Sequence, residues 1–367
     1  MTTDALPRND RDRYACPMRR LLALVLLTVP LAGCSNPPRD ACADGKPLGT
    51  ICGFENPEDG EWVPDAGVLI ASNMRNSPGR GGFLSALTPG THDVRRLWPL
   101  GTAADVGPDP AVGDPGCPGP LAANTFAPHG ITARDRLLYV VAHSNAGGRE
   151  AVEIFGIAGA GAQAVLAWKG CIPQEPKVIA NDIAVAPDGE VIESNYESEV
   201  SLLNTVLAGG FGKKTGDVMA WRRGSGWRHL PGTAASMANG VAVSADGQQV
   251  FYAETGTGKV YRLPRDGSGP AVSTTIGGNP DNLSWTPRGT LLVPTHTGGL
   301  FFLTCAMGRL PCRSSWELYE IDPATLAATR RFTHDGSIVG AIASATEVDG
   351  RIYLGSVFDD RIGVLVQ

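Results

Sequence analysis

Basic residues and nucleotide-binding motifs are scarce in this 367-residue sequence. Its 31 lysines and arginines are outnumbered by 37 aspartates and glutamates, and they form no basic block. The net charge of −6 therefore argues against nucleic acid as a partner. No Rossmann or P-loop motif stands in a strand–helix context, and no G-x-S-x-G motif supplies a serine nucleophile.

Long apolar runs are also rare, and the main one lies near the N-terminus in Met18–Ser35. This run follows two arginines and is too short to span a bilayer, which is typical of a signal peptide. Its end, LAGC at Leu31–Cys34, resembles the bacterial lipobox, in which the cysteine is lipidated and becomes the mature N-terminus. A plain secretory signal is the alternative.

We expect residues 1–33 to be a lipoprotein signal peptide, of which the first 17 are dispensable if Met18 is the start. Residues 34–50 would tether the protein, and residues 51–367 would form a single domain. Ser35 replaces the aspartate linked to inner-membrane retention, so we expect a lipid anchor on the periplasmic side of the outer membrane. This anchor would be the only membrane contact.

Cysteine is limited to eight residues, and Cys16 and Cys34 fall in or at the end of the signal peptide. The remaining six are Cys42, Cys52, Cys117, Cys171, Cys305 and Cys312. An even number in an exported chain indicates disulfides, and none of these residues has the CxxC spacing of a zinc site. Fifteen pairings are open; short separations favour Cys42–Cys52 and Cys305–Cys312, which leaves Cys117–Cys171.

Glycine and proline are abundant, with 47 and 28 residues, and favour short strands joined by tight turns. One pattern recurs: a small polar pair, a strand of alternating apolar residues, a turn often built on Asp-Gly or Arg-Gly, and a second apolar strand. It occupies residues 56–72, 127–144, 180–195, 238–255, 279–296 and 340–356. Six units predict an all-β fold, a six-bladed β-propeller with four-stranded blades around a central channel. Two β-sandwich domains are the alternative.

Histidine is rare, yet two of the six histidines lie at the outer ends of one predicted hairpin. His129 and His143 are equidistant from a turn centred near Asp135–Arg136. In an antiparallel hairpin this makes them near-opposite neighbours, with Cβ atoms about 5 Å apart. An imidazole with a pKa of about 6.5 can take a proton from water at neutral pH, and a second one can hold its tautomer. Chance placement at strand ends is the alternative.

The innermost strands of a propeller all follow the channel, so equivalent repeat positions face one axial point. Just before these strands, five repeats carry polar residues: Glu58-Asp59, His129, Asn181-Asp182, Asn239 and Asp281-Asn282. The carboxylate and amide oxygens of these repeats, to which His129 adds none, would form a cage that suits Ca²⁺, which accepts six to eight oxygen ligands, better than Mg²⁺. Such residues are also ordinary turn formers at strand entrances, but five in phase indicate a metal site.

An ordered set of short motifs resembles the paraoxonase and arylesterase family of calcium-dependent lactonases, within the gluconolactonase-like six-bladed propellers. The resemblance extends from about Cys52 to the C-terminus. It rests on PED at 57–59, PHGI at 128–131, VVAHSNAGGREAVEIF at 140–155, NDI at 181–183, ANG at 238–240, DN at 281–282 and GSVFDDRI at 355–362.

The resemblance implies an exported enzyme that binds two calcium ions and hydrolyses lactones or aryl esters. The ligands of a catalytic calcium would be Glu58, Asn181, Asn239, Asp281 and Asn282. The ligands of a structural calcium would be Asp59, Asp182 and the main-chain carbonyl of Ile131. The catalytic residues would be His129, as general base, and His143, which orients it and shares its proton.

The sequence departs from this family in four places. No cysteine follows Cys312, so the ring cannot close through the family's terminal disulfide and must close by strand pairing or another bridge. Ser144 replaces a proline, and the family's hairpin around the histidines is longer. The segment between the third and fourth repeats diverges, which leaves the substrate preference open. The lipobox replaces a retained apolar helix.

Three further residues are candidates for the wall of a substrate pocket. His296 ends the second strand of its repeat, and Asn195 and Tyr196 lie in the motif IESNY. The alternatives are a turn filler for His296 and exposed strand ends for the other two.

Two further functions stay open at this point. The first is a non-catalytic propeller, stabilised by calcium, that binds a protein or glycan in the cell envelope. The second is a sugar-lactone hydrolase of the gluconolactonase branch. The pair His129/His143 favours ester hydrolysis, because a binding platform needs no base beside the metal.

Overall fold

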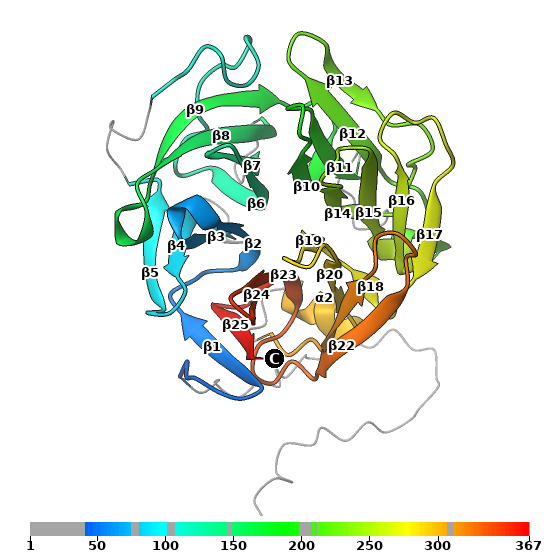
Figure 1. Ribbon diagram of the computed structural model, residues 1–367. Helices are drawn as coiled ribbons and strands as arrows, with labels where there is room; N and C mark the ends of the chain where they lie inside the picture. Colours follow the sequence, from blue (N-terminus) through cyan, green and yellow to red (C-terminus); the bar gives the residue numbers. More distant parts are fainter. Residues whose placement is uncertain are drawn as a thin grey trace, which may run out of the picture. The chain divides into compact units, whose positions relative to one another are not determined.

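Six antiparallel sheets surround a central channel, as Figure 1 shows, so the predicted six-bladed propeller is confirmed. The computed structural model describes residues 41–74, 81–100, 107–144, 149–197, 207–209, 211–306 and 312–366. The predicted signal peptide and Cys34, the predicted lipidation site, lie outside these residues.

The first four blades each have four strands that follow one another from the channel outward. The first contains β2 (Pro57–Val63), β3 (Val68–Asn73), β4 (Phe83–Thr88) and β5 (Asp93–Trp98). The second contains β6 (Phe126–Arg134), β7 (Leu137–Ser144), β8 (Ala151–Ala158) and β9 (Val165–Pro173). The third contains β10 (Ile179–Val185), β11 (Val191–Glu197), β12 (Asp217–Arg222) and β13 (Gly226–His229). The fourth contains β14 (Ala238–Val243), β15 (Gln249–Glu254), β16 (Lys259–Pro264) and β17 (Val272–Thr275).

The fifth blade has a divided innermost strand. Its parts are β18 (Asn279–Pro280) and β19 (Ser284–Trp285), which both pair with β20 (Leu291–His296). The outer strands are β21 (Trp316–Ile321) and β22 (Ala328–His334).

The sixth blade closes the ring with strands from both ends of the domain. It contains β23 (Ile342–Val348), β24 (Arg351–Ser356), β25 (Arg361–Val366) and β1 (Leu48–Cys52). The outermost strand β1 pairs with β25 from Leu48↔Leu365 to Cys52↔Arg361. The ring therefore closes by strand pairing, and β1 begins within the segment that the sequence assigns to the tether.

The hydrophobic core lies between the blades. Six clusters of buried side chains each combine two neighbouring blades, and together they complete the circle. Between the first two blades, the rings of Trp98 and Phe126 meet edge to face at 4.7 Å. Each sheet thus packs one face on the preceding blade and the other on the following blade, which agrees with strands such as β3 and β14 that are buried at every position.

The three disulfides have the pairing that the sequence favours. Cys42 is bonded to Cys52, Cys117 to Cys171 and Cys305 to Cys312. The first fastens the start of the domain to β1, and the second ties a loop to β9. The third joins the short helix α2 (Leu300–Ala306) to the chain before β21.

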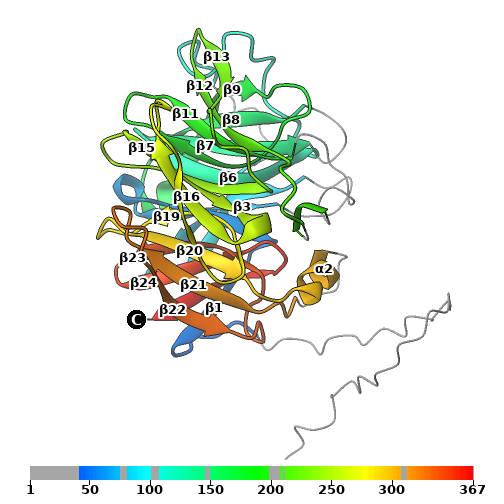
Figure 2. The same cartoon turned by 90° about the vertical axis from the view of Figure 1, so that its right-hand side faces the viewer.

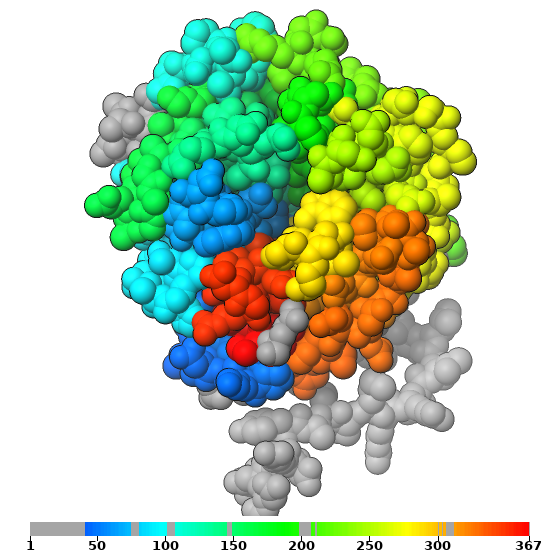
Figure 3. Space-filling view, in the orientation of Figure 1, coloured from blue at the N-terminus to red at the C-terminus, as the bar shows by residue number. Residues whose placement is uncertain are grey.

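The helix α2 lies on one face of the ring, seen from the side in Figure 2. A cavity of about 1160 Å³ lies in the channel along the later residues of the innermost strands, and its lining includes Glu61, Asp182 and Trp285. The space-filling view in Figure 3 shows the hollow at the centre of the ring. Among the described residues, no helix is long and apolar enough to cross a membrane.

Candidate active site

The pairing of each innermost strand breaks at the residues that the repeat places at the channel. The breaks fall between Pro57 and Asp59, Pro128 and Ile131, Ala180 and Ile183, and Ala238 and Val241. In the fifth blade, Asp281 and Asn282 lie in the gap between β18 and β19. At each break, residues of the innermost strand have no partner in the neighbouring strand, as in a β-bulge. Their side chains leave the regular alternation of the strand, and these residues are among the channel residues.

The channel residues form an upper layer whose buried oxygens have incomplete hydrogen bonding. Within the described chain, no hydrogen-bond donor reaches Glu58 Oε2 or the Oδ1 atoms of Asn181, Asn239 and Asn282. These four side chains expose 8% of their surface or less. Asn282 Nδ2 donates to Glu58 Oε1 at 2.8 Å, which joins the fifth blade to the first. Burying such oxygens without donors is costly, so the layer fits a bound hard cation.

The electrostatics of the channel agree with this fit. Burial, together with Asp59 and Asp281, raises the pKa of Glu58 well above its usual range. Burial also raises the pKa of Asp182, and that of Asp59 to about 6. A positive charge beside these groups would favour their ionised forms. In the described part of the chain, no three His, Cys, Asp or Glu side chains form a metal cluster, and three of the four upper-layer oxygens that meet no donor there are amide oxygens.

The next residues along two of the strands form a lower layer that is fully hydrogen-bonded. Asp59 accepts backbone N–H groups of Gly60 and Ile131, each at 2.8 Å. Asp182 accepts those of Ile183 and Val241, each at 2.7 Å. Each carboxylate therefore fastens its own blade to the next one.

Glycine makes room for this lower layer. A Cβ atom on Gly130 would lie 2.5 Å from Asp182 Cα and 2.6 Å from the Asn181 carbonyl oxygen. A Cβ atom on Gly240 would lie 2.5 Å from the Asp281 carbonyl oxygen. Glycine at these positions lets neighbouring innermost strands approach each other closely.

The two histidines meet beside the upper layer. Because of the break in β6, His143 pairs with Ala127, and the rings of His129 and His143 lie 5.1 Å apart, edge to face. His129 Nδ1 is 2.9 Å from the Asn181 carbonyl oxygen and 3.7 Å from Glu58 Oε2. Both neighbours are acceptors, so Nδ1 carries the hydrogen and Nε2 keeps a lone pair. Burial, and then His143, lower the pKa of His129 to about 3, so the ring is neutral at neutral pH and is a weaker base than the value of about 6.5 expected from the sequence implies.

A glutamate that was not predicted from the sequence contacts the second histidine of the pair. Glu150 Oε2 is in hydrogen-bond contact with His143 Nδ1. The signal was present in the sequence, because His143 and Glu150 are equidistant from the middle of residues 142–151, the segment whose ends, Ala142 and Ala151, pair with each other.

His296 contacts a predicted calcium ligand. Its Nε2 lies 2.5 Å from Asp281 Oδ2, and its ring lies 4.3 Å from that of Phe302 in α2. His296 is buried and pairs with Asn279 at the start of the divided strand. The contact holds the Asp281 carboxylate in one orientation.

The other two pocket candidates lie in the third blade. Asn195 is buried, pairs with Ala180 and donates from Nδ2 to Asp217 Oδ1 at 3.2 Å. The hydroxyl of Tyr196 donates to Met237 Sδ at 3.1 Å, and burial raises its pKa. Asn195 is therefore no exposed strand end, and Tyr196 is half-buried.

Comparisons with known proteins identify the class of fold. Neither a protein-family model nor a curated protein matches the chain. Among solved structures, a luciferin-regenerating enzyme aligns over 87% of this chain and 95% of its own, with 12% identity and a TM-score of 0.54. A gluconolactonase from Xanthomonas campestris aligns over 91% of this chain and 99% of its own, with 16% identity and a TM-score of 0.52. At such identities the likeness shows a shared six-bladed propeller fold.

Proposed function

We propose that this chain is an exported, calcium-dependent hydrolase of lactones or aryl esters of the paraoxonase type. One observation carries the proposal: the ring of His129 lies beside a layer of buried oxygens that lack donors, and a second histidine contacts it. The similar Xanthomonas campestris protein is named as a gluconolactonase, so the same fold is found in a protein named for lactone hydrolysis, which supports this reaction class.

Two sets of residues would hold the calcium ions. Glu58, Asn181, Asn239, Asp281 and Asn282 would hold the catalytic ion, and His296 would orient the Asp281 carboxylate. Asp59, Asp182 and the carbonyl of Ile131 would hold a structural ion, since a carboxylate that accepts backbone N–H groups keeps further lone pairs. The catalytic ion would polarise the substrate carbonyl and stabilise the developing oxyanion.

The histidines would supply the proton transfer. The Asn181 carbonyl orients His129 through Nδ1 at 2.9 Å, and Nε2 is left to accept a proton from the attacking water. His143 would hold the His129 ring and share the proton. Because the water attacks directly, no covalent nucleophile is required.

The protein would act outside the cytoplasm. Three disulfides agree with an oxidising compartment, and a lipid on Cys34 of the lipobox would anchor the protein at the periplasmic side of the outer membrane.

The test is hydrolysis of γ-lactones, δ-lactones and phenyl acetate by the purified mature protein, with calcium or with chelator. His129→Gln should lower turnover by about a hundredfold or more, the range expected for loss of a general base. The exposed His229 provides the control variant His229→Gln, which should leave turnover unchanged. Calcium-dependent melting with no turnover on any ester would instead support the binding propeller.

A further inference from the structure

The carboxylate of Glu150, the residue before β8, contacts the histidine pair through His143. Its Oε2 contacts His143 Nδ1, and its Oε1 accepts the backbone N–H of Ser144 at 3.4 Å. The side chains of His143 and Glu150 expose 20% and 27% of their surface, so this contact is partly shielded from water. A carboxylate at Nδ1 selects the tautomer with the hydrogen on Nδ1 and leaves Nε2 as the acceptor.

The backbone around Glu150 is fixed by the second blade. The carbonyl of Glu150 accepts the N–H of Gln174 at 3.1 Å. The next residue, Ala151, begins β8 and pairs with Ala142 on one side and Pro173 on the other.

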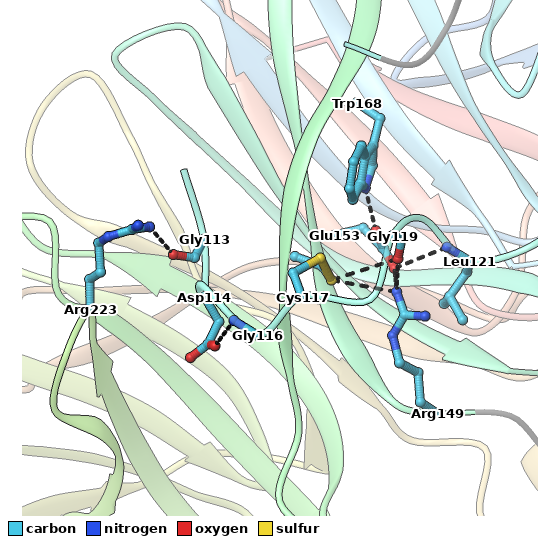
Figure 4. Close-up of a disulfide and its surroundings, with 11 residues drawn as sticks. Gly113, Asp114, Gly116, Cys117, Gly119, Leu121, Arg149, Glu153, Trp168 and Arg223 are labelled. Atoms are coloured by element: carbon cyan, nitrogen blue, oxygen red, sulfur yellow. Dashed lines mark hydrogen bonds and ion pairs between the residues drawn. A yellow bond between two sulfur atoms is a disulfide. The ribbon is translucent and has the colours of Figure 1, made fainter. Parts of the chain in front are cut away.

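The preceding residue, Arg149, is held by a buried cluster at the Cys117–Cys171 disulfide, drawn in Figure 4. Its guanidinium donates to the Gly119 carbonyl and to Glu153 Oε1, the latter at 2.8 Å, and lies 3.5 Å from Cys171 Sγ. Glu153 is 1% exposed and accepts Trp168 Nε1 at 2.5 Å. We call these residues, Cys117, Arg149, Glu153, Trp168 and Cys171, the disulfide brace.

We propose that Glu150 is the positioning residue of the histidine pair, and that the disulfide brace keeps it in place. Glu150 acts through His143 and touches no reacting atom. The inference rests on the proposed function, because the histidine pair must act in hydrolysis for its positioning to affect turnover.

The first test compares Glu150→Gln and Glu150→Asp, using a lactone substrate with calcium and the full chain. Loss of an orienting carboxylate should lower kcat of Glu150→Gln by about 10- to 100-fold with little change in KM, and Glu150→Asp should recover part of it. Glu175→Gln is the matched control, because Glu175 makes a similar contact to the exposed His229 at 3.3 Å. Equal kcat values for Glu150→Gln and Glu175→Gln would overturn the proposal.

A second readout needs no turnover. In ¹⁵N-histidine NMR spectra, the signals of His143, assigned with His143→Gln, should show a hydrogen on Nδ1 that Glu150→Gln removes or redistributes. Identical His143 signals in wild type and Glu150→Gln would overturn the positioning role. If the wild type hydrolyses no ester but this change is seen, the positioning stands and the proposed function fails.

The brace has its own test. The double variant Cys117→Ser/Cys171→Ser should lower kcat several-fold at a temperature where the protein stays folded. Cys42→Ser/Cys52→Ser, which removes a disulfide of the sixth blade, should not. Equal kcat values for the two double variants would show that the brace does not support Glu150.

Discussion

Two successive layers of the channel differ in the hydrogen bonding of their buried oxygens. In the upper layer, Glu58 Oε2 and the amide oxygens of Asn181, Asn239 and Asn282 meet no donor in the described chain. One residue further along the first and third blades, Asp59 and Asp182 have every carboxylate oxygen bonded to a backbone N–H. Each lower-layer oxygen therefore has a donor within the chain, whereas the upper-layer oxygens need a ligand from outside to be satisfied.

We expect the largest effect at Gly130, where the lower layer leaves no room for a side chain. Gly130→Ala would place a Cβ 2.5 Å from the backbone Cα of Asp182, which can move only if two blades separate. We expect a loss of about 3 kcal/mol or more, or no soluble protein, in thermal unfolding. The control is Gly60→Ala in the same channel, where the nearest contact is 3.6 Å. Equal stability of the two variants would contradict the close packing.

A matched pair of variants separates the two layers directly. Asp182→Ala removes the acceptor of two backbone N–H groups and should cost about 2–4 kcal/mol in denaturant unfolding, even with chelator present. Asn181→Ala removes an oxygen that accepts no hydrogen bond from the described residues, so with chelator it should cost clearly less. The distinction between the layers fails if Asn181→Ala costs as much as Asp182→Ala without calcium.

The smallest effect concerns a buried carboxylate outside both layers. Glu193 is fully buried, its carboxylate is bonded to Gln174 Nε2 at 2.6 and 2.7 Å, and burial raises its pKa to about 8. Because the pKa in the folded state exceeds that of an unfolded chain, its contribution to stability is present at low pH and is lost as the pH rises from about 5 to about 8.

Glu193→Gln should therefore raise Tm by a few degrees at pH 8 and leave it nearly unchanged at pH 5. The new amide could also donate to Gln174 Oε1, which is buried and meets no donor in the residues described. A lower Tm at pH 8 would show that Glu193 is needed in its charged form.

The repeat pattern predicted the blades because strand alternation and tight turns are local properties of the sequence. The channel positions followed from the same repeat, and the structure places Glu58, Asn181 and Asn239 at matching breaks in their strands. The breaks themselves were not predictable, because two of them coincide with close approaches between neighbouring blades, at Gly130 and Gly240, which a strand pattern does not encode.

Contacts between strands were harder to predict than positions along them. His296 was expected in a pocket wall, but its bond to Asp281 depends on how β18 pairs with β20. Glu150 could have been predicted from the sequence. The symmetry argument that paired His129 with His143 also pairs His143 with Glu150 across the segment between β7 and β8. The disulfide brace joins a loop to β8 and β9 through tertiary packing, which a strand pattern does not encode.

The central claim is that the upper layer binds calcium, and calorimetric titration of chelator-stripped protein tests it most directly. We predict that the wild type binds calcium and that Asn239→Ala, which removes one upper-layer oxygen, binds it at least about tenfold more weakly while remaining folded. No calcium binding by the folded wild type, or equal affinity in Asn239→Ala, would contradict the account.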